Sequence, residues 1–157
     1  MKTNTSSFEY NVFDYNELSD TQKELVDHAR KATYRSYAPY SNFKVGAAIL
    51  LSNGVIVDGA NQENAAFSAG TCAERSACFY AGAEYPDAKF KAIAIAARDH
   101  TDDFIENPIS PCGVCRQALL EYENKAGNPV EVLLVGRDKI YAVKSIRDLL
   151  PFAFSEF

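Results

Sequence analysis

The stretch "KVGAAILLSNGVIVDGA", residues 44–60, places an Asn-Gly pair between two runs of apolar residues. Asn53–Gly54 between such runs is the strongest short-range signal for a β-hairpin, because both turn residues of the tightest hairpins must accept positive φ. The sequence therefore predicts two antiparallel, neighbouring strands. The first run is apolar at nearly every position rather than at alternate ones, which is typical of a strand covered on both faces.

Two later runs have the same continuous apolar character, "AIAIAA" at 92–97 and "VEVLLV" at 130–135. The segments 72–84 and 112–124 have the length of helices, and strands that alternate with helices predict an α/β fold, a three-layer α/β/α sandwich. Only residues 136–138 separate "VEVLLV" from "KIYAVK". A parallel crossover needs a dozen or more residues, so these two strands pair antiparallel if they are neighbours. We expect a five-stranded mixed sheet.

The first helix is predicted to begin near Ser19 or Asp20, either of which can cap its first N–H groups. Small or apolar side chains then recur at helical spacing along one face: Leu25, Val26, Ala29, Ala32 and Thr33. Pro39 in "APYSN" ends this segment. A short helix, "SIRDLL", follows the last strand.

Residues 1–17 form a polar N-terminal arm, and residues 18–157 are expected to form one domain, because 157 residues are too few for two ordinary domains. The arm carries four interleaved aromatic residues: Phe8, Tyr10, Phe13 and Tyr15. Chain termini are usually loose, but four aromatic side chains are unfavourable to leave in water. A loose tail and a segment docked on this subunit or a neighbour are both open interpretations.

Composition excludes several classes of partner. No stretch approaches the roughly 18 apolar residues that span a bilayer, and "MKTNTSSFEY" lacks the apolar core of a secretory signal. We therefore expect no membrane partner and a cytoplasmic location, where cysteines stay reduced. The net charge is −5 and the basic residues are scattered, which is a poor electrostatic footprint for nucleic acid.

Three of the four cysteines fall in two short motifs, "TCAERSACFY" at 71–80 and "PCGVCRQ" at 111–117. Cys112 and Cys115 share one side of a helix start, and Cys72 begins the other predicted helix. If both helices start at the same edge of the sheet, their N-termini converge and stabilise thiolates there. Three protein ligands with one open position are typical of catalytic zinc.

A Cys-x-x-Cys pair alone would also fit a redox pair or half of a structural zinc site, which requires a fourth ligand. Cys78 faces elsewhere, because six residues turn an α-helix by about 240°, and we assign it to the core. His28 lies among charged residues and is expected at the surface. His100 lies in the long loop 98–110, from which it could reach the cluster.

Glu74 lies two residues after Cys72, near enough to reach a water on a metal at this site. A zinc-bound water has a pKa of about 7, and a neighbouring carboxylate can take its proton and deliver it again. A first-turn glutamate favoured only by the helix dipole is the alternative. Its position beside a three-cysteine set favours the catalytic role.

The combination Cys-x-Glu followed by Pro-Cys-x-x-Cys resembles the signature of the zinc deaminases. Five blocks occur in the order and spacing of the free-nucleoside cytidine deaminases, over about residues 18–155: "PYSNFKVGAAIL", "NQENAAF", "CAERSA", "SPCGVCRQ" and "LLPFAF". The resemblance implies a cytidine deaminase-like fold, one Zn²⁺ per subunit, and a homotetramer whose active sites are shared between subunits.

The resemblance also implies residue roles. The three motif cysteines, Cys72, Cys112 and Cys115, would bind zinc, and Glu74 would move the proton. The nucleoside would be bound by Asn61 and Glu63 at the ribose 3′-hydroxyl, Phe43 at the pyrimidine ring, Ala73 through its backbone, and Phe154 of a neighbouring subunit. Phe43 in the core, Phe154 packed on its own subunit, and Asn61 with Glu63 as a simple turn are the alternatives.

Arg75 has a separate physical argument. Three thiolates on Zn²⁺ leave a net charge of −1, which weakens its Lewis acidity, and a guanidinium that donates to thiolate sulfur withdraws charge. Arg75 follows Glu74 and Arg116 follows Cys115. The resemblance favours Arg75, and a solvated surface arginine is the alternative.

The implied reaction is hydrolytic deamination of cytidine and 2′-deoxycytidine to uridine and 2′-deoxyuridine by a zinc-activated hydroxide, as in pyrimidine salvage. Three alternatives stay open: a nucleic-acid deaminase, a deaminase of another small cytosine nucleoside such as a blasticidin-type antibiotic, and a non-enzymatic zinc-stabilised binding module. The chain departs from the family pattern at Phe67, often tyrosine, at Lys44, often proline, and in its longer loop 98–110.

Overall fold

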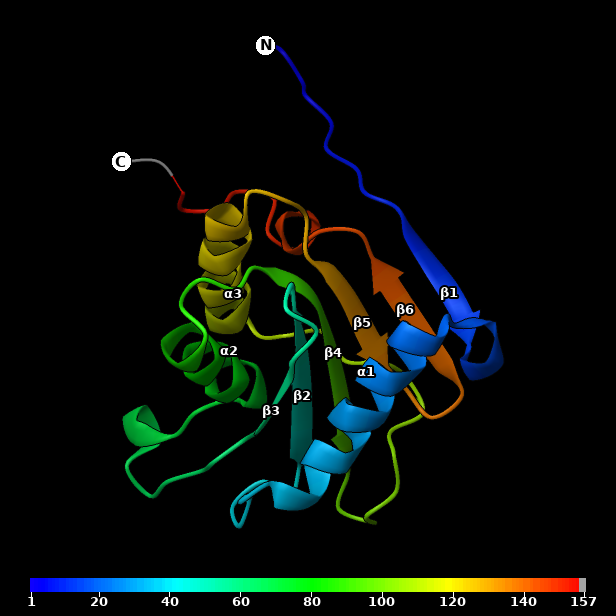
Figure 1. The fold of residues 1–157 in the computed structure, drawn as a ribbon, viewed down its shortest axis with the longest axis vertical. Helices are drawn as coiled ribbons and strands as arrows, with labels where there is room; N and C mark the ends of the chain where they lie inside the picture. Colours follow the sequence, from blue (N-terminus) through cyan, green and yellow to red (C-terminus); the bar gives the residue numbers. More distant parts are fainter. Residues whose placement is uncertain (156–157) are drawn as a thin grey trace.

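The computed structural model describes residues 1–155, and its centre is a mixed sheet in the order β1-β6-β5-β4-β2-β3. The strands are β1 (Tyr10–Asp14), β2 (Lys44–Leu51), β3 (Ile56–Ala60), β4 (Phe90–Arg98), β5 (Glu131–Val135) and β6 (Lys139–Val143). The helices are α1 (Asp20–Ala32), α2 (Ala73–Glu84) and α3 (Gly113–Ala126), with 3-10 turns η1 (Tyr15–Glu17), η2 (Thr33–Arg35), η3 (Phe67–Ala69) and η4 (Ile146–Leu149). Figure 1 shows α1 on one face of the sheet and α2 with α3 on the other. The expected three-layer α/β/α sandwich is confirmed.

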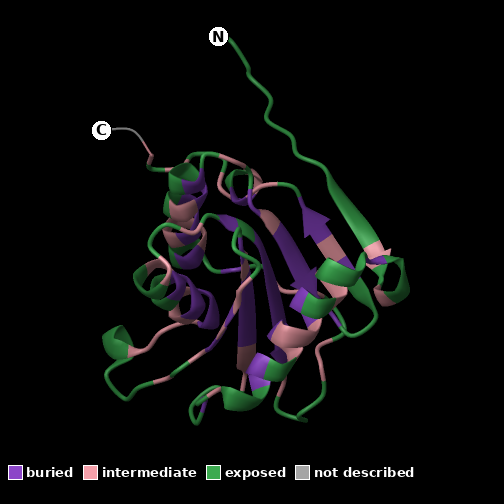
Figure 2. Cartoon of the chain, viewed as in Figure 1, coloured by how far each residue is buried: buried purple, intermediate pink, exposed green. Residues whose placement is uncertain are grey.

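The central strands are buried on both faces, as their continuous apolar runs predict (Figure 2). In β4, Ile93 and Ile95 pack in the core beneath α2 and α3, whereas the alanines Ala92, Ala94 and Ala96 pack beneath α1. Small side chains on the α1 face let that helix lie close to the sheet. Large side chains on the other face fill the wider space beneath two helices.

Two glycines permit close approach between strands and helices. A Cβ on Gly46 of β2 would lie 2.3 Å from the Ala29 carbonyl oxygen of α1. A Cβ on Gly59 of β3 would lie 2.4 Å from the backbone nitrogen of Ala77 in α2. Because real Cβ contacts are longer than 3 Å, any side chain at either position would push a helix away. The packing of Gly59 therefore sets the position of α2, whose first turn carries Glu74.

The predicted hairpin is confirmed, with β2 and β3 antiparallel and Leu50 opposite Ile56. The expectation that both turn residues adopt positive φ is wrong. Gly54 has a φ of 84°, and Asn53 is not among the residues with positive φ. The turn is longer than the tightest hairpin, because the Gly54 N–H donates to the Leu51 carbonyl and only the last loop residue is left-handed.

The expected five-stranded sheet is corrected to six strands, and the additional strand comes from the arm. Residues 10–14 pair antiparallel with β6, with Val12 opposite Tyr141. The rings of Tyr10 and Tyr141 lie 5.3 Å apart, and the Lys139 ammonium lies 2.5 Å from the Asp14 carboxylate. The outer edge of β6 would otherwise present unpaired backbone groups, and pairing with the arm satisfies them. This part of the arm is docked on its own subunit.

The predicted start of α1 and the predicted positions of α2 and α3 agree with the structure to within about two residues, but α1 ends at Ala32, well before Pro39, and continues as the 3-10 turn η2. Ser19 caps α1, because its side chain accepts the Gln22 N–H in a capping box. The α1 residues expected to face the core are buried, as is Thr33 just beyond the helix. β5 and β6 pair antiparallel across the short link, as expected. None of the described residues belongs to a helix with the length and apolarity to cross a membrane.

Candidate metal centre and active site

The starts of α2 and α3 bring three thiols together. Cys72 is the N-cap of α2, Cys112 is the N-cap of α3, and Cys115 lies in the first turn of α3. Their sulfur atoms all lie within 4.8 Å of one another, and those of Cys72 and Cys112 are 3.9 Å apart. Zinc–sulfur bonds of about 2.3 Å in a tetrahedron place sulfurs about 3.8 Å apart. The cluster therefore fits a zinc ion.

The thiols of Cys72 and Cys115 affect each other's ionisation. The pKa of Cys72 is lowered to about 5, first because the Cys115 thiol donates a hydrogen bond to it and also because Arg75 lies beside it. The same hydrogen bond, together with burial, raises the pKa of Cys115. One thiolate thus opposes ionisation of its neighbour. A divalent cation would remove that opposition and hold all three groups as thiolates.

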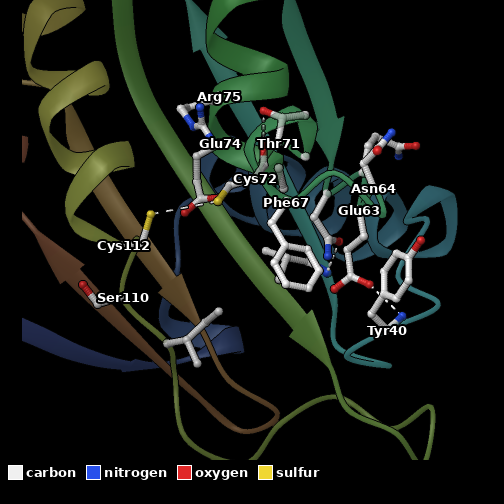
Figure 3. Close-up of a pocket in the computed structure, with 16 residues that line it drawn as sticks. Tyr40, Glu63, Asn64, Phe67, Thr71, Cys72, Glu74, Arg75, Ser110 and Cys112 are labelled. Carbon is white, nitrogen blue, oxygen red and sulfur yellow. Dashed lines mark hydrogen bonds between the residues drawn. The ribbon is translucent and has the colours of Figure 1, made fainter.

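Glu74 lies in the first turn of α2 with only 5% of its surface exposed. Burial is the main reason that its pKa is raised above the ordinary range for glutamate. Its carboxylate interacts with the thiols of Cys72 and Cys115, and Figure 3 shows it beside Cys72, with Cys112 facing the same point from α3. A buried carboxylate at this point can exchange protons with a molecule held at the cluster.

Arg75 follows Glu74 on the same turn of α2. Burial alone would lower the pKa of its guanidinium, but hydrogen bonds to Cys72 and Cys115 raise it. Its buried Nε has no hydrogen-bond partner among the described residues. Arg116, the other arginine considered from the sequence, donates to the carbonyls of Pro111 and Leu149 instead. The surroundings of Arg75 match the predicted donation to sulfur better than those of Arg116.

A cavity of about 450 Å³ opens beside the cluster, within the size range of small-molecule sites. Cys72, Glu74 and Cys112 line it, and so does Ala73 between the first two. Asn61, Glu63 and Tyr40 line it as well. Figure 3 shows Glu63 and Tyr40 apart from Cys72 and Cys112. The cavity therefore extends from the three-thiol cluster to the polar side chains of Asn61 and Glu63, which follow β3.

The side chains of Asn61 and Glu63 form hydrogen bonds with the loop between η2 and β2. The Asn61 Oδ1 accepts the Val45 N–H at 2.8 Å and the Ser36 hydroxyl at 2.5 Å, and its amide donates to the Phe43 carbonyl at 2.9 Å. The Glu63 carboxylate accepts hydrogen bonds from the Tyr40 N–H and from both the N–H and the hydroxyl of Ser41. The bond from the Ser41 hydroxyl is the largest cause of the lowered pKa of Glu63, followed by that from Tyr40. These contacts are more extensive than those of a simple turn.

Two residues implied by the resemblance do not line the cavity in the single subunit. Phe43 is half-buried, and its backbone carbonyl is held by Asn61. Phe154 is 70% exposed, and its backbone exchanges hydrogen bonds with the Gln117 side chain of α3. Their roles toward a ligand remain predictions.

Sequence reasoning did not single out several residues of the cavity wall. Tyr40 and Thr71 line it from segments that precede β2 and α2, and Ile109 and Ser110 line it from the end of the long loop. Tyr40 lies in the motif "PYSNFKVGAAIL" and Ser110 in "SPCGVCRQ". A sequence motif does not show which of its side chains face the cavity. Cys78 is buried in the core, as expected. His100 is exposed, and among the described residues it is not part of the group that could hold a metal. His28 is half-exposed and contacts Asp58 at 2.9 Å.

Fold and site together define a zinc-dependent α/β enzyme. Among residues 1–155, the group able to hold a metal consists of three cysteines, and a zinc ion bound by them would have room for one further ligand, such as water. A model of the cytidine and deoxycytidylate deaminase zinc-binding region matches residues 19–127, which include all three cysteines and Glu74. The chain belongs to this deaminase family.

Individual relatives agree with this assignment. The chain is 39% identical over 134 residues to a cytidine deaminase of Sporosarcina psychrophila, an alignment that covers 85% of this chain and 91% of the relative. It is 38% identical over 138 residues to a probable cytidine deaminase of Dictyostelium discoideum, covering 86% of each chain. A crystal structure of cytidine deaminase from Burkholderia pseudomallei matches with a TM-score of 0.69 at 40% identity, covering 83% of this chain and 97% of that one.

These findings do not favour the alternative functions. The relatives are cytidine deaminases rather than antibiotic deaminases or binding modules. The protein is a hydrolytic deaminase with a zinc-binding domain.

Proposed function

We propose that this protein deaminates cytidine and 2′-deoxycytidine hydrolytically, giving uridine or 2′-deoxyuridine and ammonia. The observation that carries the proposal is the buried Glu74 beside a three-thiol cluster, at a cavity that also presents Asn61 and Glu63. Such a cavity offers an acid–base group for the amino-substituted ring and hydrogen-bonding groups for the sugar.

Cys72, Cys112 and Cys115 would hold the zinc ion, which when bound supplies a hydroxide near neutral pH by lowering the pKa of a coordinated water. Glu74 takes a proton from the attacking water and delivers it to N3 of the pyrimidine. The same carboxylate then assists departure of the amino group as ammonia. Ala73, at the start of α2, lies in the wall of the cavity, which supports a contact between its backbone and the base.

Hydrogen-bond accounting supports recognition of a sugar hydroxyl. Within the described residues, the Asn61 Oδ1 accepts two hydrogen bonds, and the Asn61 NH₂ group uses one of its two N–H donors. Glu63 accepts three bonds, and a carboxylate has about four acceptor positions. A sugar hydroxyl that accepts a hydrogen bond from the Asn61 NH₂ group and donates one to the Glu63 carboxylate would use both remaining positions. A phosphate would be repelled by Glu63, so cytidine monophosphate should be a poor substrate.

The assembly we propose is a homotetramer with sites shared between subunits. Phe43 would meet the pyrimidine ring, and Phe154 of a neighbouring subunit would complete the cavity. The support is that Phe154 and Phe152 are 70% and 100% exposed, and that Phe79 and Tyr80 of α2 are also exposed on one subunit. Light scattering of the purified protein would report the mass, and replacement of Phe154 by alanine should raise the KM.

We also propose that the protein acts in the cytoplasm, in pyrimidine salvage. Three thiol ligands are susceptible to oxidation, so a reducing cytoplasm would preserve them, and pyrimidine salvage is the process that uses this reaction. We divide the chain into an arm, 1–17, and a zinc domain, 18–157, whose last two residues lie outside the described part. The family region begins at residue 19, which supports this division.

The direct test is ammonia release and conversion of cytidine to uridine by the purified zinc-loaded protein. A panel with cytidine, 2′-deoxycytidine, cytidine monophosphate and a blasticidin-type nucleoside separates the substrate classes. We expect turnover of the first two and at least about 100-fold lower kcat/KM for the others, because an unpaired or repelled polar group in such a site costs several kcal/mol. Equal turnover of the monophosphate would remove the role assigned to Glu63.

A further inference from the structure

Ser41 lies in the loop that precedes β2 and makes two side-chain hydrogen bonds in opposite senses. Its hydroxyl donates to the Glu63 Oε1 at 2.5 Å and accepts the Phe43 N–H at 3.0 Å. The direction of each bond is unambiguous, because an N–H can only donate and the hydroxyl has a single hydrogen left for the carboxylate. Ser41 therefore connects Glu63 to the backbone of Phe43.

The backbone around Ser41 is shaped for this connection. Asn42 adopts a left-handed conformation with a φ of 54°, which asparagine tolerates better than most residues. This conformation turns the Phe43 N–H back onto the Ser41 oxygen, the arrangement of a serine turn. The Ser41 backbone N–H also donates to the second Glu63 oxygen, at 3.3 Å.

We propose that Ser41 is a positioning residue for nucleoside binding, which acts by orienting the Glu63 carboxylate. The inference rests on the proposed function. Of the two Glu63 oxygens, Oε2 accepts two backbone N–H groups, whereas Oε1 accepts one hydrogen bond from the described residues, that of the Ser41 hydroxyl. Oε1 is thus the oxygen with capacity left for a sugar hydroxyl, and Ser41 determines where it points.

The charge of Glu63 supports the same role. The hydrogen bond from the Ser41 hydroxyl is the largest cause of the lowered pKa of Glu63, ahead of the Tyr40 N–H. Glu63 therefore stays ionised and acts only as an acceptor at neutral pH. A ligand hydroxyl that meets it must donate, and Ser41 leaves one acceptor position for that donor.

Replacement of Ser41 by alanine removes the orienting bond and leaves the thiol cluster and Glu74 intact. We expect the KM for 2′-deoxycytidine to rise about 10-fold while kcat changes less than about twofold, since a hydrogen bond to a charged group contributes about 1.5–3 kcal/mol. Ser41→Thr keeps the hydroxyl and should restore the KM to within about threefold. Ser52→Ala is a matched control, because Ser52 also accepts a backbone N–H, that of Lys89 at 3.0 Å, at the other end of β2.

The decisive comparison uses 2′,3′-dideoxycytidine, which lacks the 3′-hydroxyl that would donate a hydrogen bond to Glu63. If Ser41 acts through Glu63, Ser41→Ala should lower kcat/KM about 10-fold for 2′-deoxycytidine and less than about twofold for the dideoxy substrate. An equal loss for both substrates would overturn the proposal and make Ser41 merely structural, and so would unchanged kinetics. Wild-type protein without activity on either substrate would instead refute the proposed function.

Discussion

The sulfur atoms of Cys72 and Cys112 lie 3.9 Å apart although forty positions separate them in the chain. Each residue is the N-cap of its helix, and neither side chain caps its own helix. Both thiols are therefore directed away from local hydrogen bonding and toward each other. The packing of β3 on α2 at Gly59 and the parallel pairing of β4 with β5 place the two helix starts at one point.

Each of the three clustered cysteines should be required for zinc. Replacing Cys72, Cys112 or Cys115 by alanine leaves two sulfur ligands, so zinc per subunit should fall well below one and turnover by more than about 100-fold. Cys78→Ala is the matched control, because Cys78 is buried away from the cluster. Metal analysis of the purified variants measures this. Full zinc in Cys115→Ala would exclude that residue as a ligand.

Glu123 should contribute strongly to stability. Its buried carboxylate accepts the N–H groups of Val130 and Ile146, each at 2.9 Å, and the Ser145 hydroxyl at 2.7 Å. Glu123→Ala leaves these donors unpaired and should lower the free energy of unfolding by about 2–4 kcal/mol. Urea unfolding at constant zinc measures the change. Glu121→Ala, exposed on the same helix, should change it by less than about 0.5 kcal/mol.

The arm should protect the edge of the sheet. Deleting residues 2–14 removes β1, the contact of Tyr10 with Tyr141 and the Asp14–Lys139 ion pair. We expect a loss of about 1–3 kcal/mol in the free energy of unfolding and faster aggregation, because β6 becomes an open edge. A deletion of residues 2–7 keeps β1 and is the control. Equal stability of both deletions would show that pairing with β6 contributes nothing.

Glu131 should make stability depend on pH. Burial is the main cause of its raised pKa, and Gln22 donates to it at 3.0 Å. Because the folded pKa lies above the unfolded one, the native state binds more protons in the window from about 4.5 up to the folded pKa, and stability falls as pH rises through it. Glu131→Gln should therefore be more stable than wild type at pH 7, by less than about 1 kcal/mol, and equal to it near pH 4. Urea midpoints at several pH values measure the difference, and a constant difference would contradict this account.

The sequence predicted the parts of the fold that depend on local chemistry. Ser19 as a cap, Asn53–Gly54 as a turn and the cysteine spacing each act within a few residues, so their outcome can be worked out from the chain itself. The sixth strand could not be predicted in this way. Whether residues 10–14 pair depends on which edge of the sheet remains open, and that edge is set by β5 and β6 far along the chain.

Some residues of the candidate site could likewise be predicted from local sequence, and others could not. The thiols and Glu74 could be predicted because motif spacing and helix geometry determine where they lie. The hydrogen bonds of Ser41 could not, since they depend on the left-handed Asn42 and on Glu63 reaching the loop from the end of β3. The position of Phe154 relative to an active site depends on a second subunit, which no pattern within one chain specifies.

The central claim is that Glu74 moves protons at a zinc ion held by three cysteines, and one measurement tests it most directly. Zinc content and cytidine turnover would be determined on the same samples of wild type and Glu74→Gln. We predict equal zinc, close to one per subunit, and a kcat reduced about 10²–10⁴-fold in the variant, the usual contribution of a positioned acid–base group. Turnover in Glu74→Gln within a few fold of wild type at equal zinc would contradict the account.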